Sequence, residues 1–168
     1  MTEYVLVFPF ILRSKSEQSV LLILKDRPNS QKGRLNLLGG KIESGETPEQ
    51  AAVRELKEES GLSAMGDRFP ELVGPYICGK IVGDDFIVYC VSCYVLDSGC
   101  GTLIPREGET EKVQWHQFWQ IKGDPRLLPN LKIIIPMMQQ DVRGWTIVSP
   151  KDSGMPDSKF EIFFDSVN

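Results

Sequence analysis

The stretch GKIESGETPEQAAVRELKEESGL, residues 40–62, contains a helix whose two ends are both marked in the sequence. Thr47 is suited to the N-cap position, because a proline follows at the first helical position and Gln50 completes a T-x-x-Q capping box. Gly61 is suited to the left-handed residue that ends many helices. These signals predict a helix over residues 48–60.

One side of this helix gathers three glutamates. Glu55, Glu58 and Glu59 fall within a sector of roughly 100°, although like charges three and four residues apart cost about 0.2–0.5 kcal/mol per pair. A solvated acidic face is one explanation. The other is a site for a hard cation, because Mg²⁺ and Mn²⁺ prefer oxygen ligands such as carboxylates. The sector beside the glutamates is apolar and is predicted to pack against a sheet: Ala52, Val53 and Leu56.

A basic segment precedes the acidic helix. It places five basic residues within seventeen positions: Lys25, Arg27, Lys32, Arg34 and Lys41. The segment is either a solvated lysine-rich loop or a source of cations for phosphate groups. An enzyme that cleaves a phosphate ester or anhydride is expected to have basic residues that bind phosphates next to carboxylates that bind metal ions.

The same stretch resembles the Nudix box, G-x5-E-x7-R-E-U-x-E-E-x-G-U, in which U is an apolar residue. Every specified position matches: Gly40, Glu46, Arg54, Glu55, Leu56, Glu58, Glu59, Gly61 and Leu62. The resemblance to the Nudix hydrolases implies an α/β protein, namely an α/β/α sandwich with a mixed central sheet and the box as a loop–helix–loop. It also implies metal-dependent hydrolysis of a nucleoside diphosphate linked to a further moiety X.

Carried over by position, the resemblance implies a role for each polar box residue. The three glutamates of the acidic sector would bind Mg²⁺, with Mn²⁺ as the alternative ion, together with the backbone carbonyl of Gly39. Arg54 would orient the glutamates, and Glu46 would brace the loop. Glu58 or Glu59 would take the proton of the attacking water.

Family members also use a proton acceptor outside the box. Three acids precede Val113 and Trp115: Glu107, Glu109 and Glu111. Glu111 is the first choice, because its place ahead of Val113 and Trp115 resembles that of an acid in family members. The alternative is that Glu111 is an ordinary acid of a loop.

The residues that select the substrate are marked less clearly. The substrate-binding candidates are Phe10, Asn36 and Trp115 for stacking or hydrogen bonding, and Arg27, Arg34 and Lys41 for phosphates. For the aromatic members, burial in the core is the alternative. The marks of family members that act on ADP-ribose, dinucleoside polyphosphates or NADH are absent or out of register.

We therefore expect hydrolysis of a (d)NTP or an oxidised nucleotide to a nucleoside monophosphate and pyrophosphate. An ADP-ribose or nucleotide-sugar pyrophosphatase is the first alternative, and a non-catalytic nucleotide-binding module is the second.

Composition indicates one ordinary globular domain over residues 1–168, with 41% hydrophobic and 25% charged residues. A net charge of −4 and a pI near 5.1 argue against binding to long nucleic acid or to an acidic membrane. Neither a signal peptide nor a membrane-spanning run is found. Cys90 and Cys93 point to opposite faces of a predicted strand, which favours buried thiols over a metal or redox pair and fits a reducing cytoplasm. Both a monomer and a homodimer are compatible with the sequence.

Apolar runs and turn residues predict the other elements. Strands are expected over residues 4–12, 20–24, 72–81, 85–96, 112–115, 145–148 and 160–164, with a short apolar segment over 35–38. Residues 129–141 have helical apolar spacing, and Pro136 should kink or break that helix.

Overall fold

The computed structural model describes residues 1–12, 18–63, 75–95, 103, 108, 110–149 and 161–165, and only the backbone of residues 11, 12 and 94. The strands are β1 (Thr2–Leu12), β2 (Gln18–Leu24), β3 (Leu35–Asn36), β4 (Leu38–Lys41), β5 (Tyr76–Val82), β6 (Phe86–Tyr94), β7 (Lys112–Gln117), β8 (Trp145–Val148) and β9 (Glu161–Phe164). The helices are the 3-10 turn η1 (Asn29–Gln31), α1 (Pro48–Ser60), α2 (Phe118–Ile121) and α3 (Leu131–Gln139).

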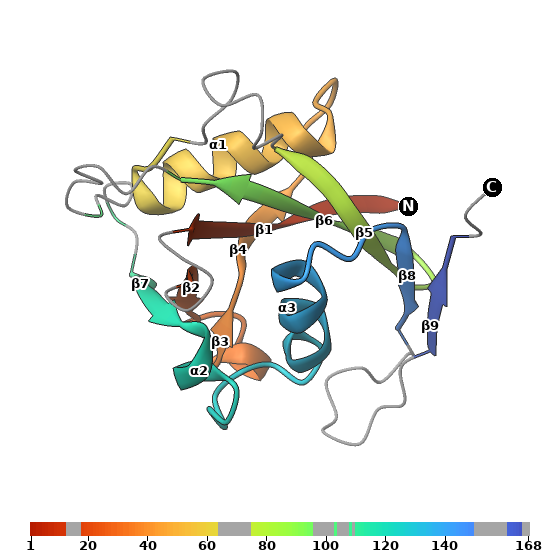
Figure 1. The fold of residues 1–168 in the computed structure, drawn as a ribbon. Coiled ribbons are helices and arrows are strands. Elements are labelled where there is room, and N and C mark those ends of the chain that lie inside the picture. The colour runs from red at the N-terminus through yellow and green to blue at the C-terminus, as the bar shows by residue number, and fades with distance from the viewer. Residues whose placement is uncertain are drawn as a thin grey trace.

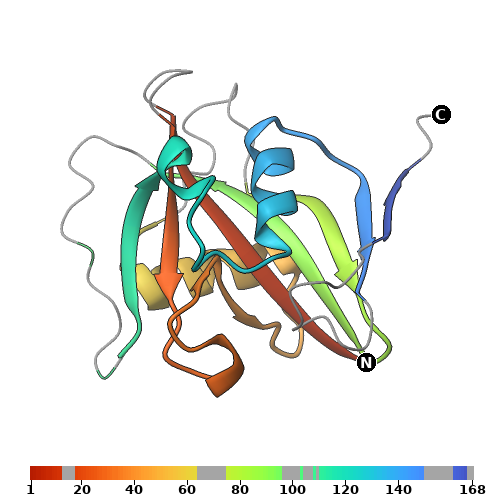
Figure 2. The same ribbon diagram turned by 90° about the horizontal axis from the view of Figure 1, so that it is seen from below.

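The strands form one mixed sheet between two helical layers. Its order is β3-β2-β1-β6-β5-β8-β9, with β4 also paired to β1 and β7 to β2. β1 runs parallel to β6 and β5 parallel to β8, whereas the other pairs are antiparallel. α1 covers one face of the sheet and α3 the other (Figure 1). Seen from below, α3 stands in front of the sheet and α1 behind it (Figure 2). The expected α/β sandwich with a mixed sheet is confirmed.

β1 changes its partner along its length. Residues 4–7 pair with β4, and residues 10–12 pair with β2. Pro9 lies between the two pairings, where a residue without an N–H group loses no ladder hydrogen bond on that edge. The segment from the end of β2 to the start of β4 therefore lies beside the place where β1 changes from one partner strand to the other. This segment forms part of the candidate site.

Each face of the sheet has its own core. On the face of α3 the buried residues include Phe8, Leu22, Cys90, Leu131 and Ile134. On the face of α1 they include Val5, Val7, Leu56, Val91 and Cys93. Cys90 and Cys93 thus point to opposite faces, as predicted. Burial raises the pKa of both thiols, that of Cys93 to about 12.

α1 has the predicted bounds, but its buried side differs by one residue. Ala52 and Leu56 are fully buried as expected, whereas the prediction for Val53 was wrong, since its side chain is 37% exposed. Ala51 is buried in its place. The stripe that faces the sheet therefore consists of Ala51, Ala52, Glu55 and Leu56, which is an i, i+1, i+4, i+5 pattern.

The C-terminal helix is shorter than predicted and is continuous. α3 begins two residues later and ends two residues earlier than the predicted range 129–141, and it continues through Pro136 for three residues. Pro136 does not break the helix, because Ile135 and Met138 on either side of it are buried against the sheet.

The strands lie where they were expected, with shifts of a few residues at their ends. Residues 72–74, 96 and 160 of the predicted strands are outside the described residues, and β5 begins at Tyr76. Among the described residues, no helix is long and apolar enough to cross a membrane.

Candidate active site

α1 and the turn before it form the first half of the site. The predicted capping box is present: the Gln50 N–H donates to Thr47 Oγ1 at 3.2 Å, and the Thr47 N–H donates to Gln50 Oε1 at 2.9 Å. At the other end, Gly61 has a φ of 76° and its N–H donates to the Lys57 carbonyl. Both helix ends therefore satisfy backbone groups that would otherwise lack partners.

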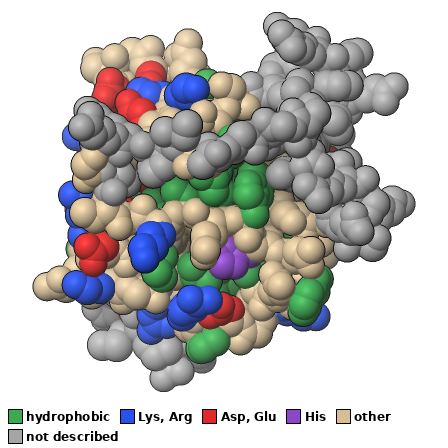
Figure 3. Space-filling view, turned by 90° about the vertical axis from the view of Figure 1, so that its left-hand side faces the viewer, with side chains coloured by type: hydrophobic (Ala, Val, Ile, Leu, Met, Phe, Trp, Pro, Cys, Tyr) green, Lys and Arg blue, Asp and Glu red, His purple; other side chains and the backbone are tan. Residues whose placement is uncertain are grey.

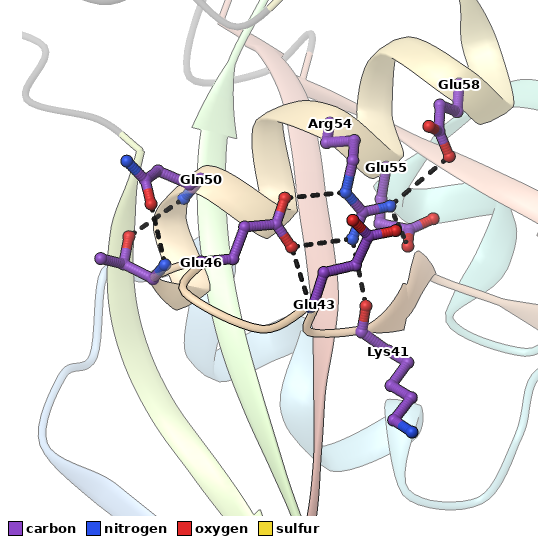
Figure 4. A network of polar contacts seen from close by, with 8 residues as sticks. Lys41, Glu43, Glu46, Gln50, Arg54, Glu55 and Glu58 are labelled. Atoms are coloured by element: carbon purple, nitrogen blue, oxygen red, sulfur yellow. Dashed lines mark hydrogen bonds and ion pairs between the residues drawn. The ribbon is translucent and has the colours of Figure 1, made fainter.

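Arg54 connects the turn to the acidic side of α1 (Figure 4). Its Nε and Nη2 donate to the two carboxylate oxygens of Glu46 at 2.8 and 3.0 Å. Nη1 donates to Glu55 at 2.8 Å and to Glu58 at 3.5 Å, and Nη2 also reaches the Lys41 carbonyl at 3.1 Å. The planar guanidinium thus holds three carboxylates and one carbonyl in a fixed arrangement.

The two glycines of β4 let the acidic side chains approach the backbone. The Gly39 N–H donates to Glu59 Oε2 at 2.9 Å. Gly39 has a φ of 149°, and a Cβ there would lie 2.0 Å from the Val5 carbonyl oxygen. A Cβ on Gly40 would lie 2.2 Å from Glu55 Oε1. Glycine is required at Gly39, where the β1 backbone occupies the space of a side chain, whereas a side chain at Gly40 would displace the Glu55 carboxylate.

Burial acts on the glutamates unequally. Hydrogen bonds from Arg54 lower the pKa of Glu46. Burial raises the pKa of Glu55, although Arg54 opposes the rise. Burial also raises the pKa of Glu59, to about 8, and the hydrogen bond from Gly39 opposes this only in part. Two carboxyls of the cluster are therefore held where a negative charge is costly.

The donor set fits a hard divalent cation in its chemistry. Glu55, Glu58 and Glu59 offer carboxylate oxygens, the ligands that Mg²⁺ prefers, and a cation would offset the burial of two of them. In the part of the chain that the structure describes, no three acidic, histidine or cysteine side chains are gathered as they stand to hold a metal ion. The side chains of Glu55 and Glu59 are instead directed to Arg54 and Gly39.

A cleft of about 450 Å³ forms the second half of the site. It reaches Gly39 and Gly40, and apolar residues from several strands and loops line it: Leu6, Leu37, Ile81, Phe86, Val88 and Leu128. Among its described lining residues, Lys25 is the single charged one, and three carboxamides accompany it: Gln31, Asn36 and Asn130. The cleft is therefore suited to a flat, uncharged group with amide-like hydrogen bonding next to an anionic group.

Of the six substrate-binding candidates, only Asn36 lines this cleft. Arg34 donates to the Pro125 carbonyl at 3.0 Å, and the Arg27 N–H donates to Glu111. Lys41 is exposed at the end of β4. Sequence reasoning missed Lys25 as the cleft cation, although it is part of the basic segment.

The two aromatic candidates also lie outside the cleft. Phe10 packs on Phe8, with ring centroids 5.4 Å apart, and lines a separate cavity of about 100 Å³. Trp115 packs against the core on the face of α1. Sequence reasoning missed Asn130, because its place just before α3 becomes relevant only once the fold brings it to the cleft that Asn36 also lines.

Glu111 lies just before β7 and is 5% exposed. Its Oε2 accepts from Lys25 Nζ at 2.7 Å, and its Oε1 accepts the N–H groups of Asp26 and Arg27 at 2.9 and 3.3 Å. Burial alone would raise its pKa, but these hydrogen bonds outweigh it and lower the pKa. Glu107 and Glu109 are outside the described residues.

Charge is distributed unevenly over the surface that carries β7. In Figure 3, acidic and basic side chains lie side by side at the top, at the level of α1, and a second, mostly basic group lies in the lower half. Hydrophobic side chains occupy the band between them. A chain with a net charge of −4 thus presents local positive charge.

Comparison with known proteins agrees with the box and the fold. A relative from Caenorhabditis elegans carries the name "Putative nudix hydrolase 1". It is 40% identical over 114 residues, which are 68% of this chain and 29% of the relative. The oxidized purine nucleoside triphosphate hydrolase of Mus musculus is 42% identical over 104 residues, 62% of either chain. The chain thus spans less than two thirds of both relatives.

Among solved structures, the MutT protein of Bacillus halodurans aligns with a TM-score of 0.68 at 17% identity, covering 96% of this chain and 97% of that one. At this identity the likeness concerns the fold alone. The model of the NUDIX domain matches residues 4–137. This match covers most of the chain and includes the whole box, and the chain therefore belongs to the NUDIX family.

Proposed function

We propose that this protein is a metal-dependent hydrolase of nucleoside diphosphates linked to a moiety X. We propose further that its substrate is a (d)NTP or an oxidised nucleotide, which it cleaves to a nucleoside monophosphate and pyrophosphate. One observation carries the proposal: an amide-lined cleft meets the glutamate cluster of α1 at Gly39 and Gly40. The cleft suits a nucleobase, and the cluster suits the cation that accompanies its phosphates.

The carboxamides would read the edge of the base. Asn36 Nδ2 donates to Gln31 Oε1 at 3.3 Å, and Asn36 Oδ1 accepts from the Leu37 N–H at 2.8 Å. These contacts fix the orientation of Asn36 and leave its second amide hydrogen for a ligand. Asn130 would supply a second carboxamide, and the apolar walls would cover the faces of the base.

The glutamates would serve the phosphate end. Glu55, Glu58 and Glu59, with the carbonyl of Gly39, would hold Mg²⁺ or Mn²⁺, which when bound neutralises phosphate charge and lowers the pKa of water. Arg54 would keep the carboxylates oriented toward one another. The Glu58 side chain is 40% exposed and has a longer contact with Arg54, 3.5 Å, than Glu46 and Glu55 have, and it would accept a proton at a carboxylate oxygen.

The name of the mouse relative, an oxidized purine nucleoside triphosphate hydrolase, supports the choice of a triphosphate. We further propose that the protein acts as one domain, as a monomer or a homodimer, on free nucleotides rather than on long nucleic acid. A reducing cytoplasm suits its buried thiols, which have no disulfide partner among the described residues: Cys78, Cys90 and Cys93.

The test is a panel of substrates with Mg²⁺ or Mn²⁺. It contains (d)NTPs, oxidised dNTPs, ADP-ribose, nucleotide sugars and dinucleoside polyphosphates, and the last three are assayed with added phosphatase to reveal new monophosphates. Direct release of pyrophosphate from a triphosphate is the expected result. Turnover only in the phosphatase-coupled assays would overturn the choice of a triphosphate and identify ADP-ribose, a nucleotide sugar or a dinucleoside polyphosphate as the substrate.

The control is Glu58→Gln, which keeps the size of the side chain and removes its charge. We expect turnover to fall at least about 100-fold, as for the loss of a metal ligand or a proton acceptor, with unchanged circular dichroism. Nucleotide binding without turnover in the wild-type protein would identify a non-catalytic nucleotide-binding module instead.

A further inference from the structure

Lys25 and Glu111 form an ion pair at the edge of the cleft. β2 and β7 are antiparallel and place Leu24 opposite Lys112. Lys25, which follows Leu24, therefore lies opposite Glu111, which precedes Lys112. Lys25 Nζ and Glu111 Oε2 are 2.7 Å apart, and the two side chains are 18% and 3% exposed. Solvent screens a pair so well shielded less than an exposed one, and removing either partner would leave the other charge poorly compensated.

The other oxygen of Glu111 holds the chain that follows Lys25. It accepts the backbone N–H groups of Asp26 and Arg27, which begin the loop. The loop is closed at Lys25, whose N–H donates to the Arg34 carbonyl and whose carbonyl accepts the Gly33 N–H, both at 2.8 Å. Within this loop lie Pro28 and Gln31, which line the cleft.

Lys25 lies between two parts of the site. It lines the cleft together with Gly39 and Gly40, and its charge acts on Glu59, as does that of Glu111. No other charged residue is found among the described lining residues of the cleft. The ammonium group is therefore the cation available to an anionic ligand among the described lining residues of the cleft.

We infer that Glu111 is a positioning residue, which fixes Lys25 at the phosphate end of the cleft and holds the loop after it as a wall for the base. Lys25 is the group that contacts the phosphates. This inference rests on the proposed function, and it gives Glu111 a role other than that of proton acceptor. Both oxygens of Glu111 already accept N–H groups, Oε2 from Lys25 and Oε1 from Asp26 and Arg27.

The test compares Glu111→Gln, Lys25→Met and the double variant. The glutamine retains an acceptor for the two backbone N–H groups and lacks the charge that pairs with Lys25. We expect each single variant to raise KM about ten-fold or more with kcat within about three-fold of wild type. The double variant should have the KM of Lys25→Met, because Glu111 acts through Lys25.

Asp141→Asn is the matched control. Asp141 also accepts three hydrogen bonds, one from Tyr76 and two from Arg143, but it does not line the cleft. This variant should keep both KM and kcat. All variants are compared at equal folded fraction, measured by thermal unfolding, so that a loss of stability is not counted as a loss of affinity.

Several results would overturn the inference. A fall in kcat of about 100-fold for Glu111→Gln, with KM unchanged and the acid limb of the pH–rate profile lost, would make Glu111 the proton acceptor. KM effects that multiply in the double variant would show that Lys25 and Glu111 act independently.

Binding separates this inference from the proposed function. The probe is a dNTP whose bridging oxygen between the α and β phosphorus atoms is replaced by a methylene group. If the wild-type protein cleaves no nucleotide but binds this analogue about ten-fold more tightly than either variant, the inference holds and the proposed function fails. Equal affinities, or no binding by the wild-type protein, would contradict the inference.

Discussion

At the residue scale, the site contains carboxyl groups whose burial makes their ionised form costly for the stability of the fold. Burial raises the pKa of Glu55 and of Glu59, whereas Arg54 lowers that of Glu46. A solvated acidic face, the simpler explanation of the three glutamates, would leave the pKa of Glu59 unchanged. Groups with strongly shifted pKa values are concentrated at functional sites, which supports the proposed metal role.

Glu59→Gln tests this conflict between stability and function. The native pKa of about 8 lies above the unfolded value of 4.5. Between these pH values the unfolded chain loses the proton and the native protein keeps it, so metal-free stability falls as pH rises. In chelator, the variant should therefore be more stable than wild type by roughly 1–3 kcal/mol at pH 8, less than the full shift because solvent screens the group, and equal at pH 4.5. Urea unfolding at both pH values measures this.

Glu46→Gln is the matched control with the opposite sign. Its pKa is lowered in the native protein, so the carboxylate stabilises the fold above the unfolded pKa and loses this effect as pH falls. The variant should be less stable than wild type at pH 7 and equal to it in acid. A Glu59→Gln variant that loses stability at pH 8 in chelator would contradict the assignment.

Arg54→Lys tests how far one side chain orders the cluster. A lysine ammonium lacks the planar fork that reaches Glu46, Glu55 and the Lys41 carbonyl together. We expect kcat to fall about ten-fold or more, with a stability loss of about 1–2 kcal/mol. Arg126→Lys is the control, since Arg126 pairs with Asp124 on the surface and its side chain is 52% exposed. Equal effects of the two substitutions on kcat would contradict an ordering role for Arg54.

Single residues were predictable where a spaced motif names them. The box motif places Glu55, Glu58 and Arg54 on one helix, and Arg54 contacts both glutamates as well as Glu46 in the turn before the helix. Lys25 and Asn130 were not predictable, because no local pattern distinguishes a lysine or an asparagine of a loop. Their relevance comes from strand pairing and from the packing of α3, which bring distant segments to one cleft.

At the element scale, α1 was predictable to the residue because both of its ends are chemically marked. α3 lacks such marks: Asn130 precedes it without a side-chain cap, and Gln140 ends it. Pro136 suggested a break there, yet the buried residues of α3 keep the helix continuous. Local signals therefore fix the ends of a capped helix, whereas packing decides the extent of an uncapped one.

Gly61→Val tests the marked end of α1. With a φ of 76°, Gly61 has a conformation that a β-branched residue disfavours. We expect a stability loss of about 1–3 kcal/mol, measured by urea unfolding, and a smaller loss for Gly61→Asn, because asparagine tolerates the left-handed region. Equal losses for the two variants would show that side-chain contacts, rather than the backbone conformation, determine the stability loss at Gly61.

At the scale of the whole molecule, the sheet places the two halves of the candidate site on either side of Gly39 and Gly40. The acidic helix covers one face, and the cleft lies by α3 on the other. The α/β/α layers and the mixed sheet were implied by the box resemblance, and the elements were predicted from apolar runs and turn residues. The cleft did not, because its walls come from β1, β3, β5, β6 and the start of α3, which only the complete topology brings together.

This arrangement predicts that metal binding and folding are linked through pH. A divalent cation needs Glu59 ionised, so binding must release a proton wherever the pH lies below about 8. Mg²⁺ should raise the unfolding temperature of the whole protein, more at pH 8 than at pH 6, and a chelator should reverse the rise. Thermal unfolding at a series of Mg²⁺ concentrations measures it. In Glu59→Gln the rise should be lost at both pH values, because a neutral amide replaces the carboxylate. A rise of the same size at pH 6 and pH 8, retained in the variant, would place the cation elsewhere on the protein.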